Sequence, residues 1–407
     1  MRIALISEHA SPLAHLGGVD AGGQNQHVSE LAGALAEDGH DVRVYTRQDS
    51  PDLAPELHPR PGVVVEHVPA GPAQPLSKDD LLPYMGIFGE WLLGRWRDGS
   101  WTPDVAHAHF WMSGLAALTA RSRFPVPVVV TYHALGSVKR RYQGSADTSP
   151  RQRIGYERVI GKQADGVVAQ CSDELDELVN IGVPRERISL IPSGVNADCF
   201  TPQGPAAPRT GAPRILCVGR LVERKGYADV IRALPGIPGA ECVVVGGPPA
   251  EQLDADPLAT RLRTLAKATG VADRFRLVGG VGQQELPSWY RSADVLACAP
   301  WYEPFGLTPL EAMACGVPVV AYALGGFTDT VVDGVTGHLV PPRDHRALAT
   351  TVRRLLREPS RRLAYATAAM DRARSCYSWR RTAEQLTRLY ARVCGREAAL
   401  YPQVVSA

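Results

Sequence analysis

Residues 301–316, WYEPFGLTPLEAMACG, follow the apolar run ADVLACAP and contain two glutamates, Glu303 and Glu311, with seven residues between them. The apolar run predicts a buried strand. The tetrapeptide TPLE predicts a helix start, with Thr308 as N-cap and Glu311 closing a capping box. A loop that leads from a strand end into a helix N-terminus is suited to an anion such as phosphate. Spacing alone leaves two interpretations open: a pair of ligand-binding carboxylates, or a capping Glu311 beside a solvated Glu303.

The nonapeptide EPFGLTPLE resembles the Glu-x7-Glu motif of the retaining glycosyltransferases of family 4, which have the two-domain GT-B fold. Four further stretches resemble the family in the expected order: GGVDAGGQN, HAHFWMSG, TYHALG and GRLVERKG. The first of them is similar to the loop of the branch that holds the inositol-phosphate N-acetylglucosaminyltransferases of mycothiol synthesis and the sucrose-phosphate synthases. The resemblance implies two doubly wound Rossmann-like domains facing each other across a cleft. It also implies transfer from a nucleoside diphosphate sugar, most often a UDP-sugar, with retention at the anomeric carbon.

Predicted strands alternate with predicted helices along most of the chain, which favours parallel sheets covered on both faces. We predict an acceptor-side domain over residues 1–195 and a domain that binds the donor nucleotide over residues 214–375. Residues 196–213 are rich in proline, glycine and alanine and predict a linker. Residues 376–395 predict a C-terminal helix, which in GT-B proteins crosses back onto the first domain.

The composition is that of an ordinary globular protein, with 407 residues, 45% of them hydrophobic and 21% charged. A formal net charge of +2 gives no support to a nucleic-acid partner. No apolar run reaches the length of a transmembrane segment, and the amino terminus MRIALIS lacks the parts of a signal peptide. The eight cysteines include no close pair with metal-ligand or redox spacing. We therefore expect reduced thiols and a cytoplasmic protein, and the sequence leaves a homodimer open.

The octapeptide GRLVERKG, residues 219–226, follows the strand RILCV and places cations at a strand tip. In open α/β sheets, ligands bind beyond the carboxyl ends of the strands. An arginine and a lysine aimed at one point would neutralise a diphosphate and stabilise it as it departs. The alternative is a surface charge cluster paired with Glu223. The resemblance implies that the diphosphate-binding pair of the family is Arg220 and Lys225.

The resemblance also assigns the other donor contacts. Glu311 would bind the ribose hydroxyls and Glu303 the donor sugar. Gly22 and Gly23, in the glycine loop, would let the backbone approach the donor phosphate. His133, at the end of VPVVVTYH, would contact the transferred sugar, and a purely structural histidine is the alternative. Backbone groups that would meet the sugar and phosphate come from Phe305, Gly306, Leu307 and Thr308. The predicted catalytic residues are His133, Arg220, Lys225 and Glu303.

The acceptor side matches the family only in part. Asn25 would meet the acceptor, and Lys78 agrees with a phosphate-contacting lysine of the cyclitol-phosphate branch. Phe110 stands where that branch has a tyrosine, and Ala134 where it has a threonine. Two hydroxyl contacts to an acceptor phosphate are therefore absent.

Two further groups of cations bear on the acceptor. Arg153 or Arg151 would replace an arginine of the cyclitol-phosphate branch. The run Lys139 to Arg141 predicts either a site for another phosphorylated acceptor or a solvated face. We expect a small polar acceptor of the sugar-phosphate or cyclitol class. The predicted acceptor-binding residues are Asn25, Lys78, Phe110, Lys139 and Arg153.

Two patterns raise the question of a metal. His107 and His109 alternate on DVAHAHF, but no third ligand has a convincing spacing. Asp254 and Asp256 match a metal-binding DxD motif superficially, in a polar loop that we interpret as solvated. We expect no metal and no cofactor besides the nucleoside diphosphate sugar as co-substrate. Two other classes stay open: a GT-B sugar-nucleotide epimerase or hydrolase, and a nucleotide-sugar-binding protein without catalysis.

Overall fold

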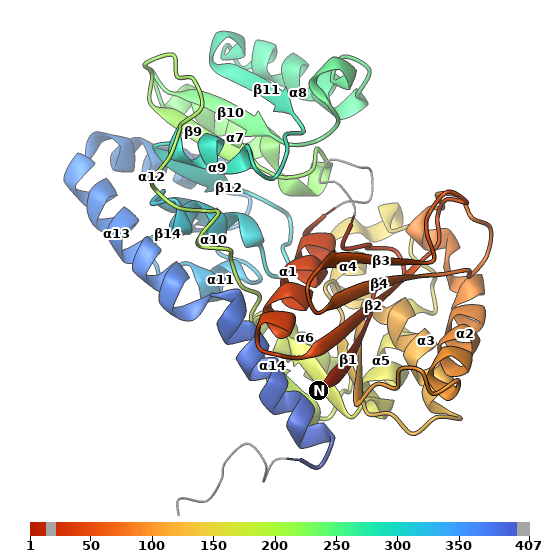
Figure 1. The fold of residues 1–407 in the computed structure, drawn as a ribbon. Helices are drawn as coiled ribbons and strands as arrows, with labels where there is room; N and C mark the ends of the chain where they lie inside the picture. Colours follow the sequence, from red (N-terminus) through yellow and green to blue (C-terminus); the bar gives the residue numbers. More distant parts are fainter. Residues whose placement is uncertain (14–21, 397–407) are drawn as a thin grey trace, which may run out of the picture. The chain divides into compact units, whose positions relative to one another are not determined.

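The computed structural model describes residues 1–13 and 22–396 and divides into two compact α/β units. The first unit contains residues 1–13, 23–192 and 379–396, and the second centres on residues 193–378. Each unit is built on one sheet with its own helices (Figure 1). The prediction of two Rossmann-like folds is confirmed.

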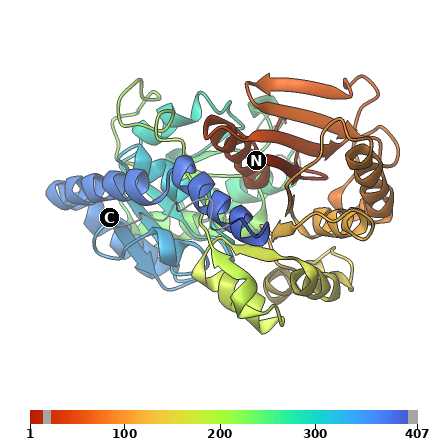
Figure 2. The same ribbon diagram turned by 60° about the horizontal axis from the view of Figure 1, so that its bottom comes forward.

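The sheet of the first unit has the strand order β3-β4-β2-β1-β5-β6-β7-β8. Neighbouring strands are parallel except β3 and β4, whose hairpin lies in orange at the sheet edge in Figure 2. The sequence did not reveal β3, because its residues are all exposed and include a proline. The strands are β1 (Arg2–Ile6), β2 (Asp41–Arg47), β3 (Glu56–Arg60), β4 (Val63–Val68), β5 (Val105–His109), β6 (Val128–Thr131), β7 (Gly166–Ala169) and β8 (Ile188–Leu190).

Helices cover both faces of this sheet. On one face Leu31 of α1 and Leu386 of α14 share a core with Ile3 and Leu5 of β1. The other face is covered by α2, α3 and α5 through a second core. After the second unit, the chain thus returns to the first, as α14. The helices of the first unit are α1 (Gly23–Glu37), α2 (Met85–Arg97), α3 (Trp111–Arg121), α4 (Gly136–Gln143), α5 (Arg153–Gln163), α6 (Ser172–Asn180) and α14 (Trp379–Val393).

The sheet of the second unit has six parallel strands in the order β11-β10-β9-β12-β13-β14. The strands are β9 (Arg214–Val218), β10 (Glu241–Val245), β11 (Phe275–Gly279), β12 (Val295–Cys298), β13 (Val319–Tyr322) and β14 (Gly337–Val340). The helices are α7 (Tyr227–Ala233), α8 (Pro257–Ala268), α9 (Leu286–Arg291), α10 (Leu307–Ala314), α11 (Phe327–Thr330), α12 (His345–Arg357) and α13 (Pro359–Cys376).

Several segments differ from the sequence-based expectation. Helices α4 and α6 were not predicted: α4, GSVKRRYQ, is polar along most of its length, and α6 has only nine residues. Residues 196–213 belong to the second unit, where the Arg291 guanidinium donates to the Pro205 carbonyl at 2.7 Å. Among the helices that the structure describes, none is both long enough and apolar enough to cross a bilayer.

Candidate active site

The loops that follow β9 and β12 in the second unit lie side by side, because these two strands are neighbours in the sheet. β9 and β12 are parallel neighbours, so the segments that follow them leave the same edge of the sheet. The Trp301 amide donates to the Arg224 carbonyl at 2.7 Å. Gly226, with a φ of 70°, lies so near the second loop that a Cβ there would be 1.7 Å from the Ala299 carbonyl oxygen. Glycine at 226 is therefore required for the two loops to meet.

This contact places a carboxylate among cations. Lys225, on the 3-10 turn η5 (Glu223–Lys225), has its Nζ 2.5 Å from Oε2 of Glu303, and Arg224 lies 3.8 Å from the same oxygen. Burial alone would raise the pKa of Glu303. Lys225 and Arg224, with Arg220 behind them, outweigh burial and hold that pKa below its usual value. Glu303 is an ionised carboxylate held by positive charge.

Two alternatives from the sequence are wrong. Glu303 is not a solvated loop residue, because its side chain is only 10% exposed. Glu223 does not neutralise the cation cluster, because its carboxylate pairs instead with the exposed Arg261 at 2.8 Å. Lys225 therefore faces Glu303, and not Glu223, at the strand tips.

The predicted capping box at Thr308 is also wrong. Helix α10 starts two residues earlier than predicted, at Leu307; its N-cap is Gly306, and no side chain caps it. Gly306 has a φ of 83°, and a Cβ there would lie 2.4 Å from the Phe327 ring. Because Gly306 takes the N-cap position with a positive φ, Thr308 already lies inside the first helical turn and cannot be the N-cap. The N-terminus of α10 is thus left without a side-chain cap at the edge where ligands bind.

Glu311 is held by a tyrosine. It is 3% exposed, and the Tyr290 hydroxyl of α9 donates to its Oε2 at 2.6 Å. Burial and the neighbouring carboxylate raise the pKa of Tyr290, so the phenol keeps its proton. The interpretation of Glu311 as a helix cap is wrong, because no side chain caps α10. Its buried, oriented carboxylate suits the predicted contact with paired hydroxyls.

In the first unit, three histidines gather at the strand ends. His109, at the end of β5, and His133, after β6, share a hydrogen bond of 2.9 Å between Nδ1 and Nε2. His27 of α1 completes the group. Burial, with smaller contributions from neighbouring charges, lowers the pKa of His133 to about 3. The pKa values of His27 and His109 are also lowered, by burial and by the other histidines. All three rings are therefore neutral near pH 7.

The expectation that the strand histidines lack a third ligand is wrong for His109, which lies with His27 and His133. Neutral imidazoles can bind metals, but the spacing of these three is wider than zinc prefers. The three ligand nitrogens are spread over distances of up to 4.8 Å. Nitrogens on a tetrahedral zinc ion, each about 2.0–2.1 Å from the metal, lie only about 3.4 Å apart. His107 is held by Tyr390 at 2.6 Å and by Thr131 at 2.8 Å, which is a structural arrangement. Metal independence stays a prediction.

The DxD-like pair has structural roles. Asp256 is the N-cap of α8 and accepts from the Leu258 and Ala259 amides at 2.8 Å, so it is not simply solvated. Asp254 pairs with Arg263 at 2.6 Å.

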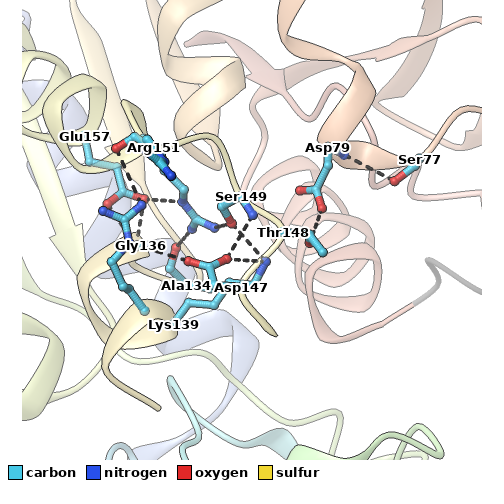
Figure 3. Close-up of polar contacts among 12 residues, drawn as sticks. Ser77, Asp79, Ala134, Gly136, Lys139, Asp147, Thr148, Ser149, Arg151 and Glu157 are labelled. Atoms are coloured by element: carbon cyan, nitrogen blue, oxygen red, sulfur yellow. Dashed lines mark hydrogen bonds and ion pairs between the residues drawn. The ribbon is translucent and has the colours of Figure 1, made fainter. Parts of the chain in front are cut away.

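Two predicted acceptor cations lie at α4: Lys139 is on this helix, with Asp147 and Ser149 beside it (Figure 3), and Arg153 donates to the Ala134 carbonyl just before it. Lys139 donates to Ser149 at 2.9 Å and pairs with Asp147 at 3.0 Å. Arg153, at the start of α5, pairs with Glu157 at 2.7 Å. The structure thus brings Lys139 and Arg153 together through Ser149, which accepts from both. Neither is a solvated charge.

The other predicted acceptor residues are held in different ways. Phe110, the N-cap of α3, has a φ of 85°, and its ring lies 5.0 Å from the Arg153 guanidinium. Asn25 of α1 is buried and donates to the Ser11 carbonyl at 3.0 Å. Lys78 opens the 3-10 turn η1 (Lys78–Asp80).

The glycine loop is described only at its end. Gly23 opens α1, and Gly22 immediately precedes it. Gly17 and Gly18 lie outside the described residues.

Sequence reasoning missed several polar residues of the first unit. Glu8 and His9 follow β1 and share a contact of 2.7 Å, with the His9 ring 4.9 Å from that of Phe110. Their position directly after a strand was the signal that could have identified them. Asp147 and Glu157 gave no such signal, because their partners are fixed only by the fold.

Comparisons with known proteins point to one family. Residues 22–194 match the family described as "Glycosyl transferase 4-like domain", and residues 204–372 match "Glycosyl transferases group 1". A D-inositol 3-phosphate glycosyltransferase of Xylanimonas cellulosilytica is 37% identical over 98% of both chains. One from Mycolicibacterium smegmatis is 36% identical over 99% of this chain and 93% of its own.

Solved structures agree in fold. A sucrose-phosphate synthase from Thermosynechococcus elongatus has a TM-score of 0.88 at 30% identity, covering 97% of this chain and 99% of its own. The Anabaena protein Alr3699/HepE, solved in complex with UDP, has a TM-score of 0.75 at 18% identity over 96% of this chain and 100% of its own. The second likeness concerns the fold alone.

Proposed function

We propose a function for this chain from the family to which it belongs, the retaining glycosyltransferases of family 4 with the GT-B fold. The proposed reaction is transfer of a hexose unit from a UDP-sugar to a cyclitol-like acceptor. The observation that carries the donor side is the contact of Lys225 with Glu303 at the tips of β9 and β12. A cation beside an oriented carboxylate suits a diphosphate joined to a sugar, since each end of the ligand meets a group of the required charge or hydrogen-bonding type.

The proposed roles divide along the donor. Arg220 and Lys225 bind the diphosphate and stabilise its charge as it departs. Glu303 accepts hydrogen bonds from hydroxyls of the sugar. Glu311, oriented by Tyr290, accepts from the ribose hydroxyls. Backbone N–H groups at the start of α10 add to the diphosphate site.

The proposed reaction exchanges one carbon–oxygen bond at the anomeric carbon for another and transfers one proton. The acceptor oxygen bonds to the anomeric carbon on the face from which the diphosphate leaves, and the carbon–oxygen bond to the phosphate breaks. The acceptor proton moves to a diphosphate oxygen, so the products are the glycoside and UDP. His133, neutral near pH 7, offers a polar contact to the transferred sugar and needs no change of charge during transfer.

We also propose a cytoplasmic location. All eight cysteines lie in the part of the chain that the structure describes, and each is a free thiol. Unpaired buried thiols are typical of proteins in reducing compartments.

The test is mass-spectrometric detection of UDP and of the glycosylated product with purified protein. UDP-glucose, UDP-galactose and UDP-N-acetylglucosamine are each paired with pooled cyclitols and sugars, with and without phosphate. The proposal predicts product and UDP in equal amounts for at least one pair. UDP without product would instead favour a hydrolase or epimerase, and binding of UDP-sugar without any UDP release would favour a non-catalytic protein.

A further inference from the structure

In the first unit, a carboxylate of the chain itself occupies the N-terminus of α4, although burial raises the pKa of this Glu157 side chain. The Gly136 amide, at the N-terminus of α4, donates to both carboxylate oxygens of Glu157, at 3.0 and 2.9 Å. Glu157 is fully buried. A helix N-terminus attracts anions through its amides and dipole. At α4 a carboxylate of the chain already makes this interaction.

The Arg153 guanidinium also donates hydrogen bonds to groups of the chain itself. Its Nε donates to Glu157 at 2.7 Å, Nη1 donates to Ser149 at 3.2 Å, and Nη2 donates to the Ala134 carbonyl. Its guanidinium carbon also lies 5.0 Å from the Phe110 ring centre. A phosphate is bound best by two parallel donors of one guanidinium. Each nitrogen of Arg153 donates one hydrogen bond to the protein, so only one N–H on each Nη is left for a ligand.

Lys139 is neutralised by Asp147. Its Nζ lies 3.0 Å from Oδ1 of Asp147, and the two side chains are 11% and 3% exposed. Burial alone would raise the pKa of Asp147, but the Ser149 amide and Lys139 lower it, so the carboxylate is charged. Lys139 and Arg153 therefore each have a carboxylate partner, and Figure 3 shows Asp147 and Glu157 close to Ser149 and Gly136.

Asp147 also has spare capacity to accept a hydrogen bond. Its Oδ1 accepts from the Ser149 amide at 2.9 Å and is paired with Lys139. Its Oδ2 is buried and accepts no hydrogen bond from any residue that the structure describes; Arg140 is 3.9 Å away. A hydroxyl can donate to this oxygen. A phosphate dianion has no proton to donate to this oxygen.

From this pattern of paired charges we propose that the acceptor is an uncharged polyol, a cyclitol or sugar without phosphate, whose hydroxyl donates to Asp147. The inference rests on the proposed function and narrows it. It sets this chain apart from the relatives whose names specify D-inositol 3-phosphate. The positions of Phe110 and Ala134 agree with it, because neither side chain offers a hydroxyl to a phosphate.

The experiment compares matched acceptors in the full-length protein. Initial rates of UDP release are measured with myo-inositol against inositol 3-phosphate, and with glucose against glucose 6-phosphate. We expect kcat/KM for the plain member of the productive pair to exceed that of its phosphorylated partner by at least about a hundredfold. Equal or better use of the phosphorylated member would overturn the proposal.

Asp147→Asn provides the reciprocal test. Asparagine keeps Oδ1 as acceptor for the Ser149 amide and Lys139, so the loop is retained, while the second oxygen becomes an NH2 donor. The preference for the plain acceptor should fall at least tenfold. Glu177→Gln is the matched control. It removes the carboxylate that pairs with Arg141 at 2.8 Å, and Arg141 lies on α4, as Lys139 does. An equal shift in the control would show a general charge effect and contradict the proposal.

Calorimetric titration with inositol 3-phosphate in the presence of UDP gives a readout independent of turnover. We expect Asp147→Asn to bind it at least tenfold more tightly than the wild type and Glu177→Gln to match the wild type. Tighter binding by the wild type would overturn the inference even if no acceptor turns over. If no acceptor pair releases UDP but Asp147→Asn binds inositol 3-phosphate more tightly than the wild type, the proposed function is refuted. The inference that Asp147 disfavours a phosphorylated ligand is then retained.

Discussion

Replacing Lys225 with methionine removes the cation at the proposed diphosphate site while keeping most of the side-chain volume. Lys225 lies 2.5 Å from Glu303, and Arg224 at 3.8 Å is the only other cation in ion-pair range of Glu303 among the described residues. Loss of one preorganised donor to a departing charge costs about 10²–10³ in rate. We therefore expect kcat/KM of Lys225→Met to fall by about that factor.

The same change should affect stability much less. An orphaned buried charge costs about 3–5 kcal/mol, but Arg224 and Arg220 still act on Glu303. We expect a loss of about 1.5–3 kcal/mol, the range for one hydrogen bond to a charged group. Lys225→Met combined with Glu303→Gln should recover most of the stability, because no buried carboxylate is left unpaired, but none of the activity.

The rate of UDP release is measured while the concentration of one substrate is varied, which gives kcat/KM. Urea unfolding of each variant gives its stability. Arg261→Met is the matched control: it removes a cation of the same unit that pairs with exposed Glu223, so activity should stay within about twofold. A folded Lys225→Met with kcat/KM within threefold of the wild type would refute the diphosphate assignment. Recovery of activity in the double variant would refute the role of Glu303.

Four further predictions follow from single contacts. Gly306→Ala should lose about 2–4 kcal/mol of stability, from a positive φ and a Cβ that meets a phenylalanine ring; an unchanged urea midpoint would contradict this. Tyr390→Phe, which removes a buried contact of 2.6 Å to His107, should cost about 1–3 kcal/mol with kcat unaltered, and a reduced kcat in folded protein would count against a purely structural role. His107 and His133 have pKa values lowered to about 3 by burial, so the unfolded chain binds more protons as pH falls below about 6.5. Each should remove about 1.2 kcal/mol of stability between pH 7 and pH 5.5, measured as a lower urea midpoint; a flat profile would contradict neutral rings. Glu311→Gln should weaken UDP binding about tenfold in calorimetry, while unchanged affinity would remove the ribose assignment.

The donor side was predictable because it depends on strand order and loop length. GRLVERKG and EPFGLTPLE each follow an apolar strand, and parallel strands bring such loops to one edge of a sheet. The structure adds what the sequence could not: that β9 and β12 are neighbours, and that Lys225 meets Glu303 rather than Glu223. Thr308 was misjudged as a cap because nothing in the local sequence reveals that Gly306 takes a positive φ.

The acceptor side was less predictable, for a physical reason. The fates of Lys139 and Arg153 are set by Asp147 and Glu157, whose positions depend on where α4 and α5 pack. A charge run in a sequence does not reveal whether its partners are solvent or buried carboxylates. His27 illustrates the same limit, because it joins the strand-end histidines only through the packing of α1.

The most direct test of the central claim is the anomeric configuration of the product, read from proton coupling constants in the NMR spectrum of a reaction with an α-linked UDP-sugar. We expect an α-glycoside, formed in equal amount with UDP and lost when Lys225 is replaced by methionine. A β-glycoside, or UDP released with no glycoside formed, would contradict it.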